Sequence, residues 1–140
     1  MGRPEVFLPA PRHTECPPAW THESEHAQLA FFPSELLEVK FRARTELTVE
    51  TVTELLKLAD ARLDRPVKYL LVDICGLDRV DADVPCLFNP VTEGMRIALL
   101  GAGPTDRVLA RFFMRKIDPL RRFTYVESRQ DALAFLLEND

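Results

Sequence analysis

The sequence predicts an α/β domain built on a mixed, mostly parallel sheet. In residues 37–44, apolar and charged residues alternate. In residues 52–63, apolar residues recur every three or four positions. Two nearly continuous apolar runs of strand length then alternate with further helical segments. The resulting three strand–helix–strand crossovers imply parallel neighbours joined by right-handed connections. The predicted order is therefore ββαβαβαβα, with four helices covering the sheet at least in part.

An antiparallel hairpin is expected first. Residues 28–32 have the composition of a strand, 33–35 that of a turn and 36–44 that of a second strand. Because successive side chains of a strand face opposite sides, the second strand presents one buried face, formed by Leu37, Val39, Phe41 and Ala43. We expect the first strand to be an antiparallel edge of the sheet.

A helix is predicted next, beginning after an N-cap at Thr48 and ending before Pro66. Its inward residues have helical spacing: Val52, Leu55, Leu56, Ala59 and Leu63. The apolar run 67–74 is typical of a strand buried on both faces. A weak helix over 80–89 follows, with aspartates at its start and Pro90 at its end.

The C-terminal part predicts a buried strand at 95–100, a helix at 105–117 and a last strand at 123–126. The residues of this helix expected to face inward are Val108, Leu109, Phe112, Phe113 and Ile117. Ser128 and Asp131 resemble a capping box. The helix that it opens should turn inward Ala132, Leu133, Phe135 and Leu136.

Residues 1–26 differ in composition from 27–140, which we expect to form a single domain. They hold five of the eleven prolines and all three histidines, without helical or strand periodicity. This pattern predicts an extended or disordered arm. Four of its side chains have the donor atoms of a zinc site, namely His13, Cys16, His22 and His26. Because the second half of a finger motif is missing, we predict neither a metal nor a cofactor.

Composition excludes several functional classes. Hydrophobic residues make up 46% and charged residues 29%, and the net charge is -4, as in ordinary soluble proteins. No stretch has the ~18 apolar residues of a membrane span. The mild acidity and the absence of a recognised motif argue against nucleic-acid binding. The N-terminus lacks a signal peptide, and three widely spaced cysteines form no disulfide framework, so we expect a cytoplasmic location.

Catalysis is not expected either. Residues 27–140 contain no histidine, so a serine or cysteine nucleophile there would lack its usual base. The cluster Asp78, Asp81 and Asp83 has no spacing of a calcium loop and is typical of a solvated loop with helix caps. The sequence therefore predicts no catalytic residue and a protein that is not an enzyme.

Residues 72–77 read Val-Asp-Ile-Cys-Gly-Leu, and residues 80–83 read Val-Asp-Ala-Asp. This pattern resembles the strand–loop–helix signature of STAS domains (sulphate transporter and anti-sigma antagonist), Asp-Leu-Ser-Gly-Leu followed by Ile-Asp-Ser-Ser-Gly. Residues 96–113 look more like an uncharacterised bacterial branch, described as STAS-like or as related to CRAL-TRIO lipid-transfer domains. The resemblance covers about 27–140 and implies a bacterial STAS-like fold.

The resemblance also singles out Asp83. In anti-sigma antagonists, a serine at the start of the second helix is phosphorylated and switches partner binding, and the matching position here is Asp83. Two interpretations stay open. Asp81 or Asp83 caps a short helix, for which aspartate is a preferred residue. Alternatively, Asp83 is a permanent substitute for phosphoserine that holds the module in one binding state.

A ligand site is expected at the turn 101–105, because ligands of open α/β sheets bind where strands end and helices begin. Gly101, Gly103 and Thr105 build this turn, and Arg107 follows in the first helical turn. The full G-x-G-x-x-G motif and a Walker lysine are absent, so the glycines equally fit a tight turn. The site would take a phosphate or a carboxylate.

Arg107, Arg111 and Arg115 form one stripe on the helix at 105–117. The stripe is either a solvated helix face or a docking face for an acidic partner or an anionic lipid surface. Residues 96–129 contain eight basic and three acidic residues, a net +5, whereas the rest holds ten against nineteen, a net -9. A local anionic contact is therefore compatible with the acidic total.

These observations predict a non-enzymatic cytosolic binding or regulatory module, whose partner is a protein or a small anionic or lipid ligand. The residues expected to bind it are Asp81, Asp83, Gly101, Gly103, Thr105, Arg107 and Arg111. Their segments follow consecutive strand ends and should lie together. The alternative is a carrier of a small molecule or lipid that uses the turn at 101–107. A homodimer through the edge hairpin or the arm is left open.

Overall fold

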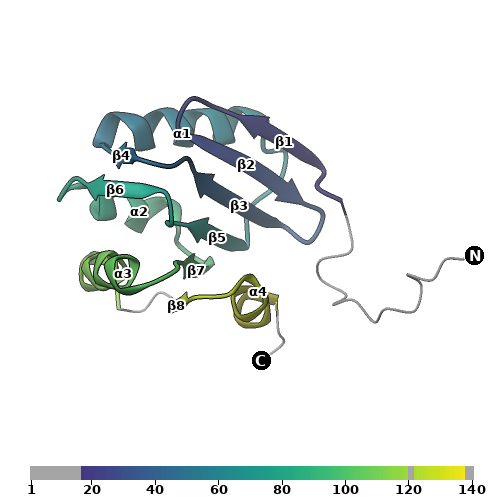
Figure 1. The fold of residues 1–140 in the computed structure, drawn as a ribbon. Helices are drawn as coiled ribbons and strands as arrows, with labels where there is room; N and C mark the ends of the chain where they lie inside the picture. The colour runs from purple at the N-terminus through teal and green to yellow at the C-terminus, as the bar shows by residue number, and fades with distance from the viewer. Residues whose placement is uncertain (1–16, 120–121, 138–140) are drawn as a thin grey trace, which may run out of the picture.

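The computed structural model describes residues 17–119 and 122–137, which form strands and helices in an α/β arrangement (Figure 1). The main sheet contains six strands: β1 (Trp20–Glu23), β2 (Ala27–Phe32), β3 (Leu36–Phe41), β5 (Tyr69–Asp73), β7 (Arg96–Leu100) and β8 (Arg122–Val126). A small second sheet pairs β4 (Thr45–Leu47) with β6 (Leu77–Val80). The helices are α1 (Val49–Arg62), α2 (Val84–Val91), α3 (Pro104–Lys116) and α4 (Arg129–Leu137).

The main sheet is mixed and mostly parallel, as the sequence predicts. Its strand order is β1-β2-β3-β5-β7-β8. The first three strands pair antiparallel, whereas β3, β5, β7 and β8 are parallel neighbours. Each parallel connection contains one helix, so the three predicted crossovers are confirmed. All carboxyl ends of the parallel strands consequently lie at one edge of the sheet, where α1, α2 and α3 follow.

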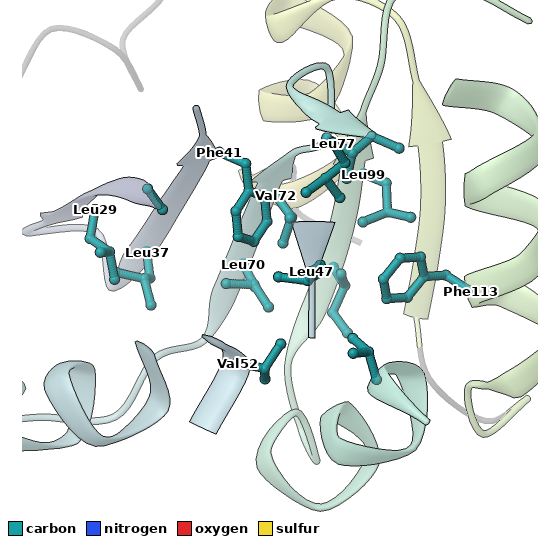
Figure 2. Packing of buried hydrophobic residues seen from close by; sticks show 14 of the residues in the cluster. Leu29, Leu37, Phe41, Leu47, Val52, Leu70, Val72, Leu77, Leu99 and Phe113 are labelled. Atoms are coloured by element: carbon teal, nitrogen blue, oxygen red, sulfur yellow. The ribbon is translucent and has the colours of Figure 1, made fainter. Parts of the chain in front are cut away.

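Helices cover both faces of the sheet. Alternate residues of β3, β5 and β7, such as Leu37, Val72 and Leu99, are buried with side chains of α1, α2 and α3 (Figure 2). The residues between them face α4 and form a smaller cluster: Leu36, Leu71, Ala98, Ala132, Leu133 and Leu136. The central residues of β5 and β7 are covered on both sides and are therefore apolar, which explains the nearly continuous apolar runs.

The predicted arm extends too far, because Trp20–Glu23 forms strand β1 in the sheet. Trp20 stacks on its cross-strand partner Phe31 with ring centroids 6.0 Å apart, and the Arg62 guanidinium lies 4.9 Å from the Trp20 ring. β1 is therefore an edge strand, and β2, expected at the edge, lies inside the sheet. Four mostly polar residues carry too little alternation to reveal this strand. The expected arm over 1–16 lies outside the described residues.

The second sheet was not predicted, and Gly76 explains how it forms. β4 and β6 leave the carboxyl ends of β3 and β5 and pair in parallel, with the Thr45 N–H donating to the Gly76 carbonyl. A Cβ atom at Gly76 would lie 2.4 Å from the Arg42 carbonyl oxygen and 2.6 Å from that of Phe41. Only glycine allows the two chains to approach so closely. The glycine of the STAS-like pattern thus has a packing role.

The predicted caps of α1 and α4 are confirmed. The Thr48 hydroxyl accepts the Thr51 N–H at 3.1 Å, and the Ser128 hydroxyl accepts the Asp131 N–H at 3.0 Å. The predicted end of the weak helix is wrong, since Pro90 lies inside the last turn of α2. A proline there removes only one backbone hydrogen bond, and the helix ends one residue later, at Val91.

One inward residue of α3 was assigned to the wrong face. Val108, expected in the core, is 63% exposed. The buried residues of α3 are Asp106, Ala110 and Phe113. Each helical residue turns the chain by about 100°, so Val108 points roughly opposite to Ala110. The exposure of a valine on this side gives α3 an unusual outer surface.

Two further sequence expectations are settled. Cys75 and Cys86, expected to be buried, are both exposed and free. Among residues 17–119 and 122–137, no helix has both the length and the apolar character of a membrane span.

Candidate functional site

The candidate site lies at the carboxyl ends of β5, β7 and β8, where α3 begins. Backbone hydrogen bonds join these ends: the Ile74 N–H donates to the Leu100 carbonyl, and the Gly101 N–H donates to the Val126 carbonyl. The turn at 101–103 is thereby held between the segments that leave β5 and β8. Polar side chains from all three segments meet there.

Asp106 supplies the carboxylate at the start of α3. It is 9% exposed, and its Oδ2 accepts the Ala102 N–H at 2.8 Å. The first backbone N–H groups of a helix lack partners within the helix and attract negative charge. Asp106 satisfies one of the N–H groups of this turn and places an anion at the positive end of α3. The turn consequently contains its own carboxylate.

Gly101 is needed for close packing rather than for an unusual backbone angle. A Cβ atom at this position would lie 2.5 Å from the Tyr125 hydroxyl and 2.6 Å from the Asp106 Cβ. A Cβ at Gly103 would meet nothing within 4 Å, and Gly103 has the extended φ of -178°, which any residue adopts. Of the two glycines that the sequence singles out, only Gly101 is required by its neighbours.

Arg107, Tyr125 and Glu127 form a hydrogen-bonded group beside the turn. Arg107 Nη2 and the Tyr125 hydroxyl each donate to Glu127 Oε2 at 2.8 Å. These two donors hold the pKa of Glu127 below its ordinary value. Desolvation, followed by the nearby Glu127 and Asp106 carboxylates, raises the pKa of Tyr125 to about 12. Arg107, predicted to contact an anion, therefore already binds one within the chain.

Cys75 follows β5 at the same edge. Its N–H donates to Asp73 Oδ1 at 3.0 Å. Desolvation and the carboxylates of Asp73 and Asp106 raise the pKa of the thiol to about 12. The thiolate is the nucleophilic form of cysteine, and it is scarce at neutral pH under these conditions. Neither this thiol nor the Tyr125 hydroxyl is activated for nucleophilic attack.

The predicted residues divide between two places. Gly101, Gly103, Thr105 and Arg107 all belong to the turn or the first turn of α3. The Asp81 N–H instead donates to the carbonyl of Leu47, the last residue of β4. Asp83, which is exposed, occupies the N-cap position of α2, but its side chain makes no capping hydrogen bond.

The helices that begin at these two places, α2 and α3, pack against each other. Near the ends of the two helices, Asn89 Nδ2 donates to the Lys116 carbonyl, and the Asp118 N–H donates to Asn89 Oδ1. The rings of Phe88 and Phe113 lie 5.6 Å apart. The carboxyl-terminal parts of α2 and α3 thus pack together. That the aspartates and the turn share one surface stays a prediction.

The outer side of α3 is a distinct surface, which we call the α3 face. It consists of the exposed residues Arg107, Val108, Arg111, Met114 and Arg115. Val108 is 63% exposed and Met114 44%. Neither Arg111 nor Arg115 forms an ion pair or a side-chain hydrogen bond within the described part of the chain, whereas Arg107 binds Glu127. The face thus combines apolar surface with cations that have no internal partner there.

Sequence reasoning missed Tyr125 and the way in which Asp106 and Glu127 meet at the turn. Asp106 lies three residues after Gly103, the position from which an acidic side chain reaches back to a helix start, and this signal was available. Tyr125 and Glu127 come to the turn only because β8 pairs with β7, with Leu99 opposite Tyr125. Cys75 was identified in the sequence but was expected to be buried.

Comparisons with known proteins address the fold. No family model and no curated protein match the sequence. The structure is similar to that of an uncharacterised protein of the DUF3478 family from Shewanella loihica PV-4, which has a SpoIIAA-like fold. The TM-score is 0.52 and the sequence identity 24%, over 84% of this chain and 90% of that chain. The predicted STAS-like fold is therefore confirmed, and the likeness concerns the fold alone.

Proposed function

We propose that this chain is a non-enzymatic binding and regulatory module that docks an acidic protein segment on the α3 face. The observation that carries this proposal is the exposure of Val108, at 63%, beside Arg111 and Arg115. A large exposed apolar side chain flanked by cations fits a partner that offers apolar and acidic residues together. Interface cores are apolar, and arginine is enriched in them.

The charge distribution supports an acidic partner. Residues 96–129 carry a net +5 within a chain of net charge -4. Opposite charge across an interface speeds association and selects the partner, while apolar contact supplies affinity. Since Arg107 is paired with Glu127, Arg111 and Arg115 are the cations of this face that have no internal partner among the described residues.

The predicted residues outside the α3 face take secondary roles in the proposal. Gly101, Gly103 and Thr105 lie at the start of α3, and the hydrogen-bonded group around Glu127 orients Arg107. Asp81 and Asp83 supply negative charge at the start of α2. The exposed Asp83 carboxylate makes no cap bond, which supports a role as a fixed substitute for the phosphoserine of anti-sigma antagonists.

A binding role is supported over an enzymatic one by the state of the reactive groups. With pKa values of about 12, the Cys75 thiol and the Tyr125 hydroxyl are both protonated at neutral pH. We include a bacterial, cytoplasmic setting in the proposal. The free, exposed cysteines Cys75 and Cys86 support it, since exposed thiols persist in a reducing compartment.

The proposal is tested by selecting a phage-displayed library of random peptides on the full chain. We expect enriched sequences that combine Asp or Glu with apolar residues, and binding that is lost in Arg111→Glu. The control is Lys40→Glu, which changes the charge equally on the exposed side of β3 opposite to α1. The proposal of a protein partner would be contradicted if no acidic peptide is recovered and the chain binds phosphatidylglycerol vesicles in a way that depends on Arg111.

A carrier of a small apolar molecule is the second candidate. One observation favours it: an apolar cavity between the sheet and α1, lined also by Phe88 and Thr92 of the α2 region. This cavity lies away from the turn at 101–107, where the sequence placed the ligand of a carrier.

A further inference from the structure

Strand β8 forms one margin of the main sheet, with α3 on one face and α4 on the other (Figure 1). The Gly101 N–H donates to the Val126 carbonyl, so Val126 turns its peptide groups toward β7. Because successive residues of a strand point these groups to alternate sides, those of Phe123 and Tyr125 point away from the sheet. Within residues 17–119 and 122–137, no other segment bonds to these outward groups. β8 therefore presents an open row of backbone donors and acceptors.

This edge lacks the features by which proteins usually prevent the addition of a strand. Such features include proline, lysine, a bulge and a very short strand. β8 has five residues, contains neither proline nor lysine, and pairs with β7 in an uninterrupted register. The opposite edge, β1, has four residues, of which only Trp20 is a large apolar one. Of the two edges, β8 is therefore the better template for a further strand.

The α3 face lies along this edge. Arg107, at the start of the face, binds Glu127, the residue that follows β8. Because α3 connects the parallel strands β7 and β8, it runs back along β8 from that point. The helix rises about 12 Å from Arg107 to Arg115, and the five residues of β8 span about 13 Å. The stripe of arginines therefore accompanies the strand over its whole length.

We propose that an acidic segment of a partner protein binds in extended conformation, as an additional strand antiparallel to β8. Its main chain bonds to the outward groups of Phe123 and Tyr125, and its acidic side chains contact Arg111 and Arg115. This inference rests on the proposed function and specifies the conformation of the partner. A second copy of the chain would bring two cationic edges together, so charge favours an acidic partner.

The two arginines also set the spacing of the acids. Arg111 and Arg115 are four residues apart, which is a rise of about 6 Å along the helix. Side chains on one face of a strand recur every second residue, about 6.6 Å apart. Two acidic residues separated by one other residue would therefore each face one arginine. The intervening side chain would lie on the face of Val126, which packs in the cluster around α4, and is expected to be apolar.

The first test compares the affinities of two synthetic peptides for the full chain by fluorescence anisotropy. One peptide alternates, Thr-Val-Glu-Val-Glu-Val-Thr, and the other has the same composition with adjacent glutamates, Thr-Val-Val-Glu-Glu-Val-Thr. We expect the alternating peptide to bind about tenfold more tightly, because one adjacent glutamate must point away from the arginines. Equal affinities of the two peptides would contradict the proposed spacing.

Backbone methylation distinguishes strand addition from contact through side chains alone. In an antiparallel pair, the residues opposite Phe123 and Tyr125 share their face of the sheet and turn their own N–H groups toward β8. The glutamates take these positions. Methylation of both glutamate amides should therefore weaken binding of the alternating peptide by at least about tenfold. Methylation of the two valine amides that precede the glutamates is the matched control and should change the affinity little. Equal effects of the two modifications would refute strand addition.

Hydrogen exchange followed by NMR locates the contact on the chain. Saturation with the alternating peptide should slow exchange of the Phe123 and Tyr125 amides at least about tenfold and leave the Thr124 amide, which faces β7, unchanged. Protection of these two amides without peptide, rising with protein concentration, would identify a second copy as the occupant and overturn the proposal.

The same measurement separates this inference from the proposed function. If an acidic peptide binds in a way that depends on Arg111 but leaves the Phe123 and Tyr125 amides unprotected, strand addition fails and docking on the α3 face stands. If neither the alternating peptide nor any selected acidic peptide binds, both proposals fail.

Discussion

The carboxylate of Asp106 accepts the backbone N–H of Ala102 at 2.8 Å, so the turn before α3 is closed by a side chain of its own helix. This contact changes the functional interpretation of the glycine-rich turn. The sequence suggests an anion-binding helix start, but the structure provides an internal anion there. An external phosphate would have to compete with Asp106 for the turn and with Glu127 for Arg107.

The first prediction concerns this contact. Asp106→Ala should lower the free energy of unfolding by about 1–2 kcal/mol, because the Ala102 N–H loses its partner and the helix loses its N-terminal charge. Urea denaturation measures the change. At constant ionic strength, phosphate should leave the wild-type melting temperature unchanged; a clear rise would show that the turn binds anions despite Asp106.

The two glycines of the turn should differ in their tolerance of a methyl group. Gly101→Ala should destabilise the fold by about 1–3 kcal/mol, since the new Cβ would overlap the Tyr125 hydroxyl and Asp106. Gly103→Ala serves as the matched control and should be close to neutral, because its Cβ would meet open space. Equal effects of the two substitutions in thermal or urea unfolding would refute this packing role.

Glu127 should contribute to the acid sensitivity of stability. Arg107 and Tyr125 lower its folded pKa below 4.5, so the ionised carboxylate stabilises the fold above that pH. The contribution disappears as the pH falls through the lowered folded pKa. The stability difference between wild type and Glu127→Gln should therefore shrink below pH 4.5, as followed by urea denaturation across pH. Glu54→Gln, exposed on α1, is the control, and an equal pH trend there would argue against the assignment.

The Cys75 thiol should react slowly although the residue is exposed. A pKa of about 12 instead of 9.0 reduces its thiolate population near pH 8 by roughly a thousandfold. A protein with Cys16→Ser and Cys86→Ser isolates this thiol for alkylation by iodoacetamide. The folded chain should react much more slowly than the same chain in urea, and Asp73→Asn should speed the folded reaction. Similar folded and unfolded rates would contradict the raised pKa.

The sequence predicts those elements that pack on the core with one face, because their apolar residues then recur with the period of a strand or a helix. The alternation around Leu37, the helical spacing around Val52 and the apolar run before Cys75 all identify their elements because each element packs on the core. Strand β1 shows no such periodicity, since Trp20 is the only one of its four residues that has a large apolar side chain. Strands β4 and β6 are short, and they pair although they are far apart in the sequence. Hydrophobic periodicity reports only on local structure and therefore does not reveal this pairing.

In the candidate site, too, the residues that are neighbours in sequence could be predicted, and those that strand pairing brings together could not. The turn and Arg107 were predictable because a strand, a glycine-rich turn and a helix follow one another in sequence. Tyr125 and Glu127 reach the turn only through the pairing of β8 with β7, a relationship between distant segments. Val108 was assigned to the core together with Leu109, Phe112 and Phe113, but the rotation of α3 is set by the burial of Ala110 and Phe113.

The most direct test of the docking surface is the dissociation constant of the strongest selected acidic peptide, measured by fluorescence anisotropy for wild type, Arg111→Glu and Lys40→Glu. Both substitutions change the net charge by the same amount, so only position distinguishes them. We predict at least a roughly tenfold weaker affinity for Arg111→Glu and a change within about twofold for Lys40→Glu. Equal weakening by both variants would show attraction by overall charge alone and would contradict docking on the α3 face.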